Sequence, residues 1–265
     1  MRSPSVKVLS LSISPSRALM LGLRHFLIFI SMMLLGLGCG AQPAIKAKSE
    51  AERIYKEGLS ALNDEDYLTA TERFRAVKTK FLFSPYAAFS ELRLGDTAFA
   101  QTRYYEAIET FRVFIQSRPN HAEVPYAYWK ISAAYAAQRP SDFFLLPPTH
   151  ERDRGSTKDA LRALQNYLDR FPEHDKAAEA KALIKACRRD LGNYELYVAR
   201  FYRQNKQWGA ARGRYEVLIE RFKDQEALWR EGAEELIEIY ERLELKEKLA
   251  ALKLALKSSE ESTEK

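Results

Sequence analysis

The chain has 265 residues, of which 46% are hydrophobic and 29% are charged. This balance allows a buried core and excludes a broadly disordered protein. The formal net charge is +6, but residues 1–38 hold four Lys or Arg and no acids, which leaves +2 for the remainder. Because acids and bases alternate along every predicted helix, a nucleic-acid-binding protein is not expected.

Residues 26–38 form an apolar run behind Arg24 and His25. A helix needs about 20 residues to span a bilayer, so this shorter run fits the core of a signal peptide better. Small residues precede Cys39, as in a bacterial lipobox, where the cysteine is acylated and becomes the first residue after cleavage. We therefore predict a lipoprotein signal peptide over 1–38 and lipidation at Cys39. The alternative is an ordinary signal peptide with an incidental cysteine, and a start at Met20 would make either signal more compact.

Residues 39–49 have the composition of a linker and are predicted to be a lipidated tether. Each buried CH₂ group contributes about 0.8 kcal/mol, so several acyl chains would hold the protein firmly on a membrane. Gly40 follows the cysteine where an Asp would, by analogy with lipoprotein sorting, retain the protein in the inner membrane. The expected location is the outer membrane, with the body facing the periplasm.

A helix–turn–helix pattern recurs through the rest of the chain. Residues 88–119 read as two antiparallel helices joined by a tight turn, with apolar residues at steps of three and four. The same residue types stand 37 positions earlier and again later in the chain, which is the tetratricopeptide pattern. The matching sets are Gly58, Tyr67, Ala70, Phe74 and Val77; Gly95, Tyr104, Ala107, Phe111 and Phe114; and, for the second helix of a later copy, Trp208, Ala211, Tyr215 and Leu218.

The third repeat departs from this spacing. Ser132 stands at the place of Gly95, but the second helix follows 16 residues late, after an insertion at 139–157. Its Phe143–Leu146 stretch is too apolar for solvent and is expected to pack on the chain itself or on a partner. A long helix is expected from about 174 to 205.

These patterns predict an all-α protein. The fold expected over 50–257 is a tetratricopeptide α-solenoid of about five helical hairpins that forms a right-handed superhelix. Unit five, residues 226–257, is less regular than the others, as suits the end of a solenoid, and residues 258–265 are predicted to be a disordered tail.

No arrangement of residues in the sequence indicates an enzyme. The four histidines are scattered and no pair has metal-ligand spacing, while phosphate loops and nucleophile elbows are absent. Cys187 has no second thiol besides Cys39 and is interpreted as a small helix residue. We therefore predict no cofactor, no metal and no catalytic residue.

A lipobox followed by about five tetratricopeptide units resembles the BamD (YfiO/ComL) family, the assembly lipoprotein of the β-barrel assembly machinery. The resemblance covers nearly all of the expected mature chain and includes the blocks at 104–121 and 167–172. The block at 195–202, with the Ala210–Tyr215 stretch that follows it, is the more specific part. Gly213 within a helix departs from the family, as do Arg118, Phe171 and Phe222, where it often has Tyr.

The resemblance implies a periplasmic scaffold with only protein and membrane partners. The C-terminal repeats would grip the barrel component of the assembly complex, with accessory lipoproteins nearby, through Arg200, Arg203 and Arg214. For Arg214, an ion pair within the solenoid is the equal alternative. The N-terminal repeats would receive unfolded outer-membrane protein precursors on a surface that includes Tyr55, Tyr67, Phe99 and Tyr104. For any single one of these residues, core packing is the better explanation.

A tetratricopeptide lipoprotein that coordinates cell-wall synthesis or envelope constriction is the main alternative, because it would share the fold. A periplasmic chaperone cofactor, or a general periplasmic interaction scaffold without a lipid anchor, is also consistent with the repeats.

Overall fold

The computed structural model describes residues 42–140 and 154–263, and in these ranges every regular element is an α-helix. The chain divides into two compact units, residues 1–53 and 54–265, and the packing given below lies within the second. The helices are α2 (Gln42–Asn63), α3 (Tyr67–Lys80), α4 (Pro85–Ala100), α5 (Tyr104–Ser117), α6 (Val124–Ala137), α7 (Gly155–Arg170), α8 (Ala177–Gln204), α9 (Trp208–Arg221), α10 (Glu226–Arg242) and α11 (Lys246–Thr263).

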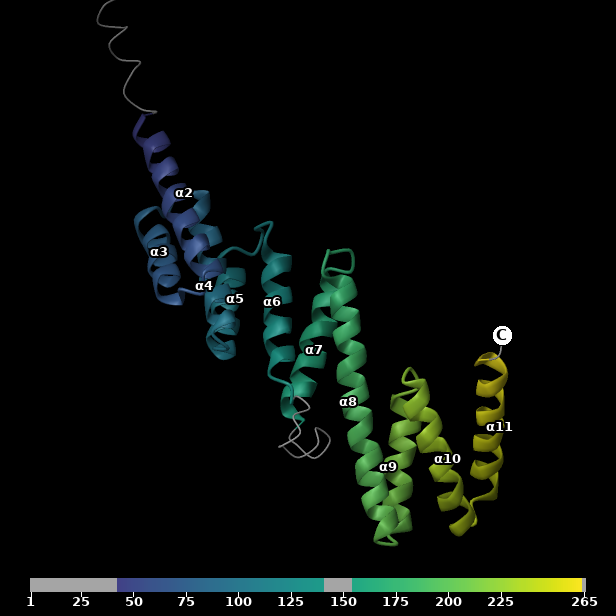
Figure 1. Ribbon diagram of the computed structural model, residues 1–265. Coiled ribbons are helices and arrows are strands. Elements are labelled where there is room, and N and C mark those ends of the chain that lie inside the picture. Colours follow the sequence, from purple (N-terminus) through teal and green to yellow (C-terminus); the bar gives the residue numbers. More distant parts are fainter. Residues whose placement is uncertain (1–41, 141–153, 264–265) are drawn as a thin grey trace, which may run out of the picture. The chain divides into compact units, whose positions relative to one another are not determined.

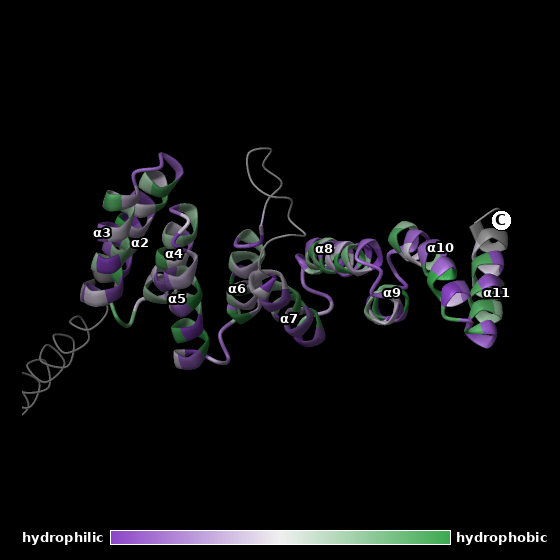
Figure 2. Cartoon of the chain, turned by 90° about the horizontal axis from the view of Figure 1, so that it is seen from below, coloured by the Kyte–Doolittle hydropathy of each residue, from purple (hydrophilic) through white to green (hydrophobic). Residues whose placement is uncertain are grey.

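From α3 onward each helix packs against the next one in the chain (Figure 1). Taken in pairs, the helices make five hairpins over the described residues, numbered 1 (α2 and α3) to 5 (α10 and α11). Figure 2 shows that hydrophobic and hydrophilic residues are both present around most helices, as expected where one side is buried and the other is wet. The tetratricopeptide arrangement predicted from the repeat is confirmed.

Two boundaries differ from the sequence expectation. Helix α2 begins at Gln42, inside the segment expected to be a tether, because Ala44, Lys46 and Ala47 are good helix formers and neither Pro nor Gly occurs between Pro43 and Gly58. Helix α11 continues to Thr263, through most of the expected tail, and the hydroxyls of Ser258 and Ser259 donate to carbonyls one turn back. Cys39 and the Phe143–Leu146 stretch lie outside the described residues.

Four of the hairpins turn in the same way. A residue in the left-handed region, with φ between 55° and 59°, stands two places before the second helix in each: Glu65, Thr102, Lys206 and Glu244. Left-handed backbone costs a non-glycine residue about 1–2 kcal/mol, so its recurrence shows that packing of the two helices imposes the turn. Hairpin 3 has the insertion instead.

Small residues allow the two helices of a hairpin to approach closely. A Cβ atom on Gly58 would lie 2.8 Å from the Phe74 ring, and one on Gly95 would lie 2.7 Å from the Phe111 ring. In hairpin 3 Ser132 fits at this place, and its hydroxyl donates to the Ala163 carbonyl at 3.0 Å.

Helix α8 has 28 residues and runs unbroken through Gly192. A Cβ atom there would lie 2.5 Å from Leu228 of α10, so the glycine serves a close approach and does not end the helix. Helix α8 packs against both α7 and α9 and therefore joins hairpin 3 to hairpin 4.

Candidate functional site

The four aromatic residues predicted to receive a precursor lie partly or fully within the packed interior. Tyr55 is 9% exposed, its ring centroid is 5.7 Å from that of Phe74, and its hydroxyl accepts a hydrogen bond from Arg93 at 3.3 Å. Phe99 and Tyr104 are half-buried and meet edge to face at 5.4 Å. Tyr67, also half-buried, stands at the equivalent of Tyr104 in hairpin 1. Core packing therefore accounts for much of each side chain.

The most exposed apolar side chains of hairpins 1 and 2 and of the loop between them are different residues. Leu68 and Tyr105 are 73% and 78% exposed and occupy equivalent places in the first turn of α3 and α5. Leu82 and Phe83, in the loop between α3 and α4, are 67% and 103% exposed. These four side chains offer apolar surface that the fold itself does not use.

The loop that carries Leu82 and Phe83 recurs between later hairpins with the same backbone hydrogen bond. The Ser84 N–H donates to the Phe81 carbonyl at 2.8 Å, and the matching bonds after α5, α7 and α9 measure 3.0–3.2 Å. At the place of Phe83 the later loops have Asn120, Glu173 and Asp224, all exposed. Only the first of these four loops has an apolar tip, which is a difference that alignment of the repeats could have revealed.

A buried carboxylate links α4 to α6. Asp96, 8% exposed, accepts hydrogen bonds from Arg93 of its own helix and from the Tyr126 hydroxyl at 2.8 Å, and it pairs with Lys130 at 2.9 Å. The Lys130 ammonium also lies 4.2 Å from the centre of the Phe99 ring. Desolvation by burial is the largest influence on Tyr126 and, with Asp96 close by, raises the pKa of its hydroxyl. The hydroxyl therefore stays protonated and donates to the carboxylate.

A second polar cluster links α8 to α10. Arg200 donates to Glu235 at 2.9 Å and also bonds Glu231, while Arg203 pairs with Glu235 at 3.0 Å. The Tyr215 hydroxyl of α9 donates to the same carboxylate at 2.6 Å. Burial alone would raise the pKa of Glu235, but Arg200, Tyr215 and Arg203 outweigh it and hold that pKa below its ordinary value.

The two clusters occupy the same places in the repeat with opposite charges. When the hairpins are aligned on their turns, Arg200 corresponds to Asp96, and Arg203 corresponds to Phe99. On the following hairpin Glu235 corresponds to Lys130, and Glu231 corresponds to Tyr126. In both cases a residue on the first helix of one hairpin bonds two residues on the first helix of the next hairpin. In the repeat alignment, those two residues stand three and seven positions before the residue that they contact. Arg200 and Arg203, predicted as partner contacts, thus first serve to join hairpin 4 to hairpin 5.

Arg214 is likewise paired within the chain. It donates to Glu195 of α8 at 3.0 Å, a hydrogen bond that raises its pKa, and Glu195 also faces Arg154 at 3.6 Å. The side chain nevertheless remains 41% exposed. An ion pair within the solenoid is therefore present, and the outer side of the guanidinium remains accessible. On α8 itself Tyr197 and Phe201, one turn apart, are 37% and 53% exposed.

With this geometry established, the chain can be placed among known proteins. A family model described as "YfiO: Outer membrane lipoprotein" matches residues 47–254. The chain belongs to the YfiO family.

Named relatives of this YfiO protein are outer membrane protein assembly factors BamD. The one from Vibrio cholerae is 26% identical over 217 residues, covering 78% of this chain and 87% of its own length. The one from Caulobacter vibrioides is 28% identical over 163 residues, and there the match spans only 51% of the relative. Among solved structures, the P58(IPK) TPR domain matches with a TM-score of 0.39 at 14% identity over 80% of this chain and 52% of that chain.

The histidines of the described part have structural roles. His121 and His174 stand at equivalent places between hairpins, and their Nδ1 atoms accept from the backbone N–H of Glu123 at 3.1 Å and of Lys176 at 3.4 Å. Ser84 does the same for the first turn of α4. Within residues 42–140 and 154–263 no group of three or more His, Cys, Asp or Glu could hold a metal ion.

Cys187 is fully buried, and burial raises the pKa of its thiol, which Arg139 approaches at 3.4 Å. A protonated, enclosed thiol is a poor nucleophile.

The YfiO family and the tetratricopeptide fold make this protein an interaction scaffold and not an enzyme. None of the described helices is both long enough and apolar enough to cross a membrane.

Proposed function

We propose that the protein is a lipid-anchored scaffold of outer-membrane β-barrel assembly that faces the periplasm. The observation that carries this proposal is the family match over 47–254, supported by relatives named as outer membrane protein assembly factors. Acylation at Cys39 would supply the anchor. The protein would act by holding other chains, which accords with a helical repeat surface and requires no catalytic group.

The N-terminal hairpins are proposed to receive unfolded barrel precursors. The support is the exposed set Leu68, Leu82, Phe83 and Tyr105, because an unfolded barrel strand presents alternating apolar side chains that need such surface. These residues replace Tyr55 and Phe99 as the preferred contacts. Tyr67 and Tyr104 stay among the proposed contacts, because they directly precede Leu68 and Tyr105 in the first turns of α3 and α5.

A peptide-binding assay tests the precursor site. The probe is a fluorescein-labelled ten-residue peptide of alternating aromatic and polar residues that ends in Phe. Replacing Leu82 and Phe83 with Asp should weaken binding about tenfold, since two apolar contacts and a charge penalty are involved. The matched control is Leu254→Asp, because Leu254 is 70% exposed on hairpin 5. Equal losses in both variants would contradict the proposal.

The C-terminal hairpins are proposed to bind the barrel component. Tyr197 and Phe201 give an aromatic pair on α8, and Arg214 on α9 keeps an accessible guanidinium in a region where Tyr194 and Tyr202 also lie close to it. Aromatic residues and arginine are enriched at the centres of protein interfaces. Their combination on adjacent helices favours a protein partner with an acidic contact.

Co-purification from solubilised envelopes tests this assignment. The wild-type protein should recover a large outer-membrane barrel with periplasmic domains, and Phe201→Asp should lose most of it. Val113→Asp is the control, because Val113 is 52% exposed on α5. Recovery of only cell-wall synthases would instead support the alternative function.

A separate variant tests the lipid anchor. Cys39→Ala should release the protein from membranes without changing its helical circular dichroism, and unchanged membrane retention would reject the lipid anchor.

A further inference from the structure

A groove recurs on the side of the hairpins formed by their second helices. The first groove lies between α3 and α5 above α4, and it has a volume of about 290 Å³. The second lies between α5 and α7 above α6, at about 660 Å³. Their linings correspond place by place: Arg75 to Arg112, Lys78 to Ile115, and Glu91 to Tyr128.

Ion pairs occupy the base of the first groove. Glu91, 9% exposed, bonds Arg118 and lies 3.4 Å from Lys78. All three of these charged residues have uncharged counterparts at the equivalent positions one hairpin later, namely Tyr128, Phe171 and Ile115. The Tyr128 ring packs against Phe171 with centroids 5.4 Å apart. The second groove therefore lacks the ion pairs found at the base of the first, and its volume is the larger of the two.

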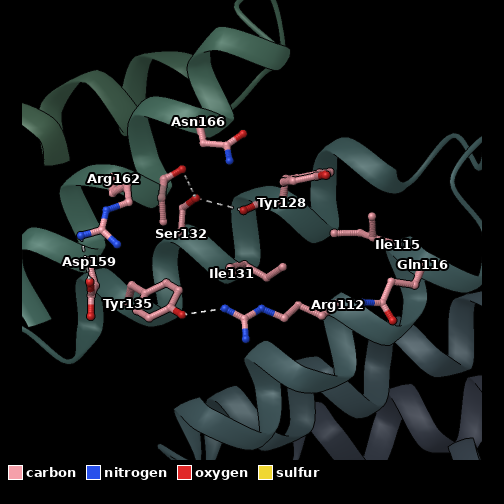
Figure 3. A pocket seen from close by; sticks show the side chains of 11 residues that line it. Arg112, Ile115, Gln116, Tyr128, Ile131, Ser132, Tyr135, Asp159, Arg162 and Asn166 are labelled. Carbon is pink, nitrogen blue, oxygen red and sulfur yellow. Dashed lines mark hydrogen bonds and ion pairs between the residues drawn. The ribbon is translucent and has the colours of Figure 1, made fainter.

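The second groove combines an apolar base with a basic rim (Figure 3). Ile115, Ile131 and Tyr128 line the base. The Arg112 guanidinium donates to the Tyr135 hydroxyl at 2.8 Å and to Glu109 at 2.6 Å, which fixes its direction.

Arg162, on the α7 side of the rim, is 80% exposed, and its contact with Asp159 is a long 3.7 Å. Gln116 and Asn166 place amide groups along the lining, where they can bond a peptide backbone. Each rim arginine has one acidic neighbour, Glu109 for Arg112 and Asp159 for Arg162. Because Arg162 is so exposed and its pair with Asp159 is long, its guanidinium can accept a further acidic partner above the apolar base.

We propose that this groove binds an extended protein segment in which apolar and acidic side chains alternate. In such a segment successive side chains point to opposite sides, so apolar ones can enter the base while acidic ones meet Arg162 and Arg112. The site lies on hairpins 2 and 3 and is distinct from the Leu82–Phe83 loop. It does not depend on the function proposed above.

Fluorescence anisotropy with two defined probes tests the proposal on the full mature chain. One probe is a labelled octapeptide of alternating Phe and Asp, and the other replaces each Asp with Lys. The acidic probe should bind at least about fivefold more tightly, since an exposed ion pair contributes up to about 1 kcal/mol. Equal affinity for both probes would overturn the proposal.

Two variants locate the binding. The double variant Ile115→Lys, Tyr128→Glu copies the charges of the first groove, and it should abolish binding of the acidic probe. Arg162→Glu, at an 80% exposed position, should weaken that binding about fivefold without disturbing the fold. Since Arg162→Glu leaves the core untouched, it decides the question even if the double variant unfolds.

The matched control is Arg189→Glu, because Arg189 is 63% exposed and pairs with Asp190 at a similar 3.6 Å. Loss of acidic-probe binding in this control as great as in Arg162→Glu would overturn the proposal, as would full binding in the Ile115→Lys, Tyr128→Glu variant. Sedimentation velocity without peptide tests whether the groove instead binds a second molecule of this protein. Self-association that Arg162→Glu removes would overturn the peptide proposal in favour of that second molecule. Binding that Phe83→Asp leaves unchanged separates this groove from the precursor site.

Discussion

Hairpins 2 and 3 and hairpins 4 and 5 are joined by the same contact with the charges reversed. In the first case a carboxylate, Asp96, faces Lys130 and Tyr126. In the second a guanidinium, Arg200, faces Glu235 and Glu231. The geometry of the repeat therefore determines which positions contact each other, and the residues at those positions determine the sign of each charge. Reversed signs at one geometry also disfavour pairing of hairpins in the wrong order, since like charges would then meet.

The two contacts differ in burial, and this difference sets the sizes of the effects expected from mutation. The Asp96 side chain is 9% exposed, whereas Glu235 is 18% exposed and Arg200 is 37% exposed. A buried charge that loses its partner is costly, but a surface pair contributes little.

Removing the buried carboxylate should have the largest effect. Asp96→Ala leaves Arg93 and Lys130 without their shared partner, so the free energy of unfolding should fall by about 3 kcal/mol. Urea denaturation followed by circular dichroism measures this. The control is Asp64→Ala, an exposed turn residue. A loss no greater than that caused by Glu235→Ala would contradict the expectation that the more buried contact contributes more.

The C-terminal contact should respond less. Glu235→Ala removes the acceptor shared by Arg200, Arg203 and Tyr215, and we expect a loss of about 2 kcal/mol because the cations left behind can reach water. Glu231, bonded only to Arg200 and 49% exposed, should matter less. Equal losses for Glu231→Ala and Glu235→Ala would contradict the shared-acceptor description.

Acid should weaken the C-terminal contact in a defined direction. Because the folded protein holds the pKa of Glu235 below its ordinary 4.5, this group stabilises the fold fully above about pH 4.5, and its contribution is lost as pH falls through the lower folded value. Glu235→Gln should therefore show a shallower loss of stability between pH 5 and 3 than the wild type. Parallel pH profiles measured by urea denaturation would reject this.

Arg214 should give the smallest change in stability. Its pair with Glu195 is 41% exposed on the arginine side, so Arg214→Ala should cost less than about 1 kcal/mol. If Arg214 also contacts the barrel component, the same variant should still reduce co-purification of that partner. A large loss of stability with intact co-purification would assign the residue to the fold alone.

Periodicity in the sequence predicted the helices, the hairpin turns and the late second helix of hairpin 3, because these depend on residue spacing and on small residues such as Gly58 and Gly95. It did not predict the Asp96 and Glu235 clusters. The Tyr126–Asp96 and Arg200–Glu235 bonds join residues 30 and 35 positions apart, and they become visible only when the hairpins are placed side by side.

The partner contacts named from the sequence remain predictions, and helical spacing alone did not reveal how exposed each of them is. Aromatic residues at helical spacing, such as Tyr55, serve the core, whereas the exposed Phe83 lies in a loop where helical periodicity does not apply. Comparing the same loop across repeats, Phe83 with Asn120, Glu173 and Asp224, is the sequence test that finds it.

The most direct test of the scaffold account is photo-crosslinking in intact cells, with benzoylphenylalanine placed at position 83 in one strain and at position 214 in another. The account predicts that position 83 crosslinks to newly made barrel precursors and position 214 to the barrel component. Crosslinks from both positions to one and the same partner, or the reverse assignment, would contradict it.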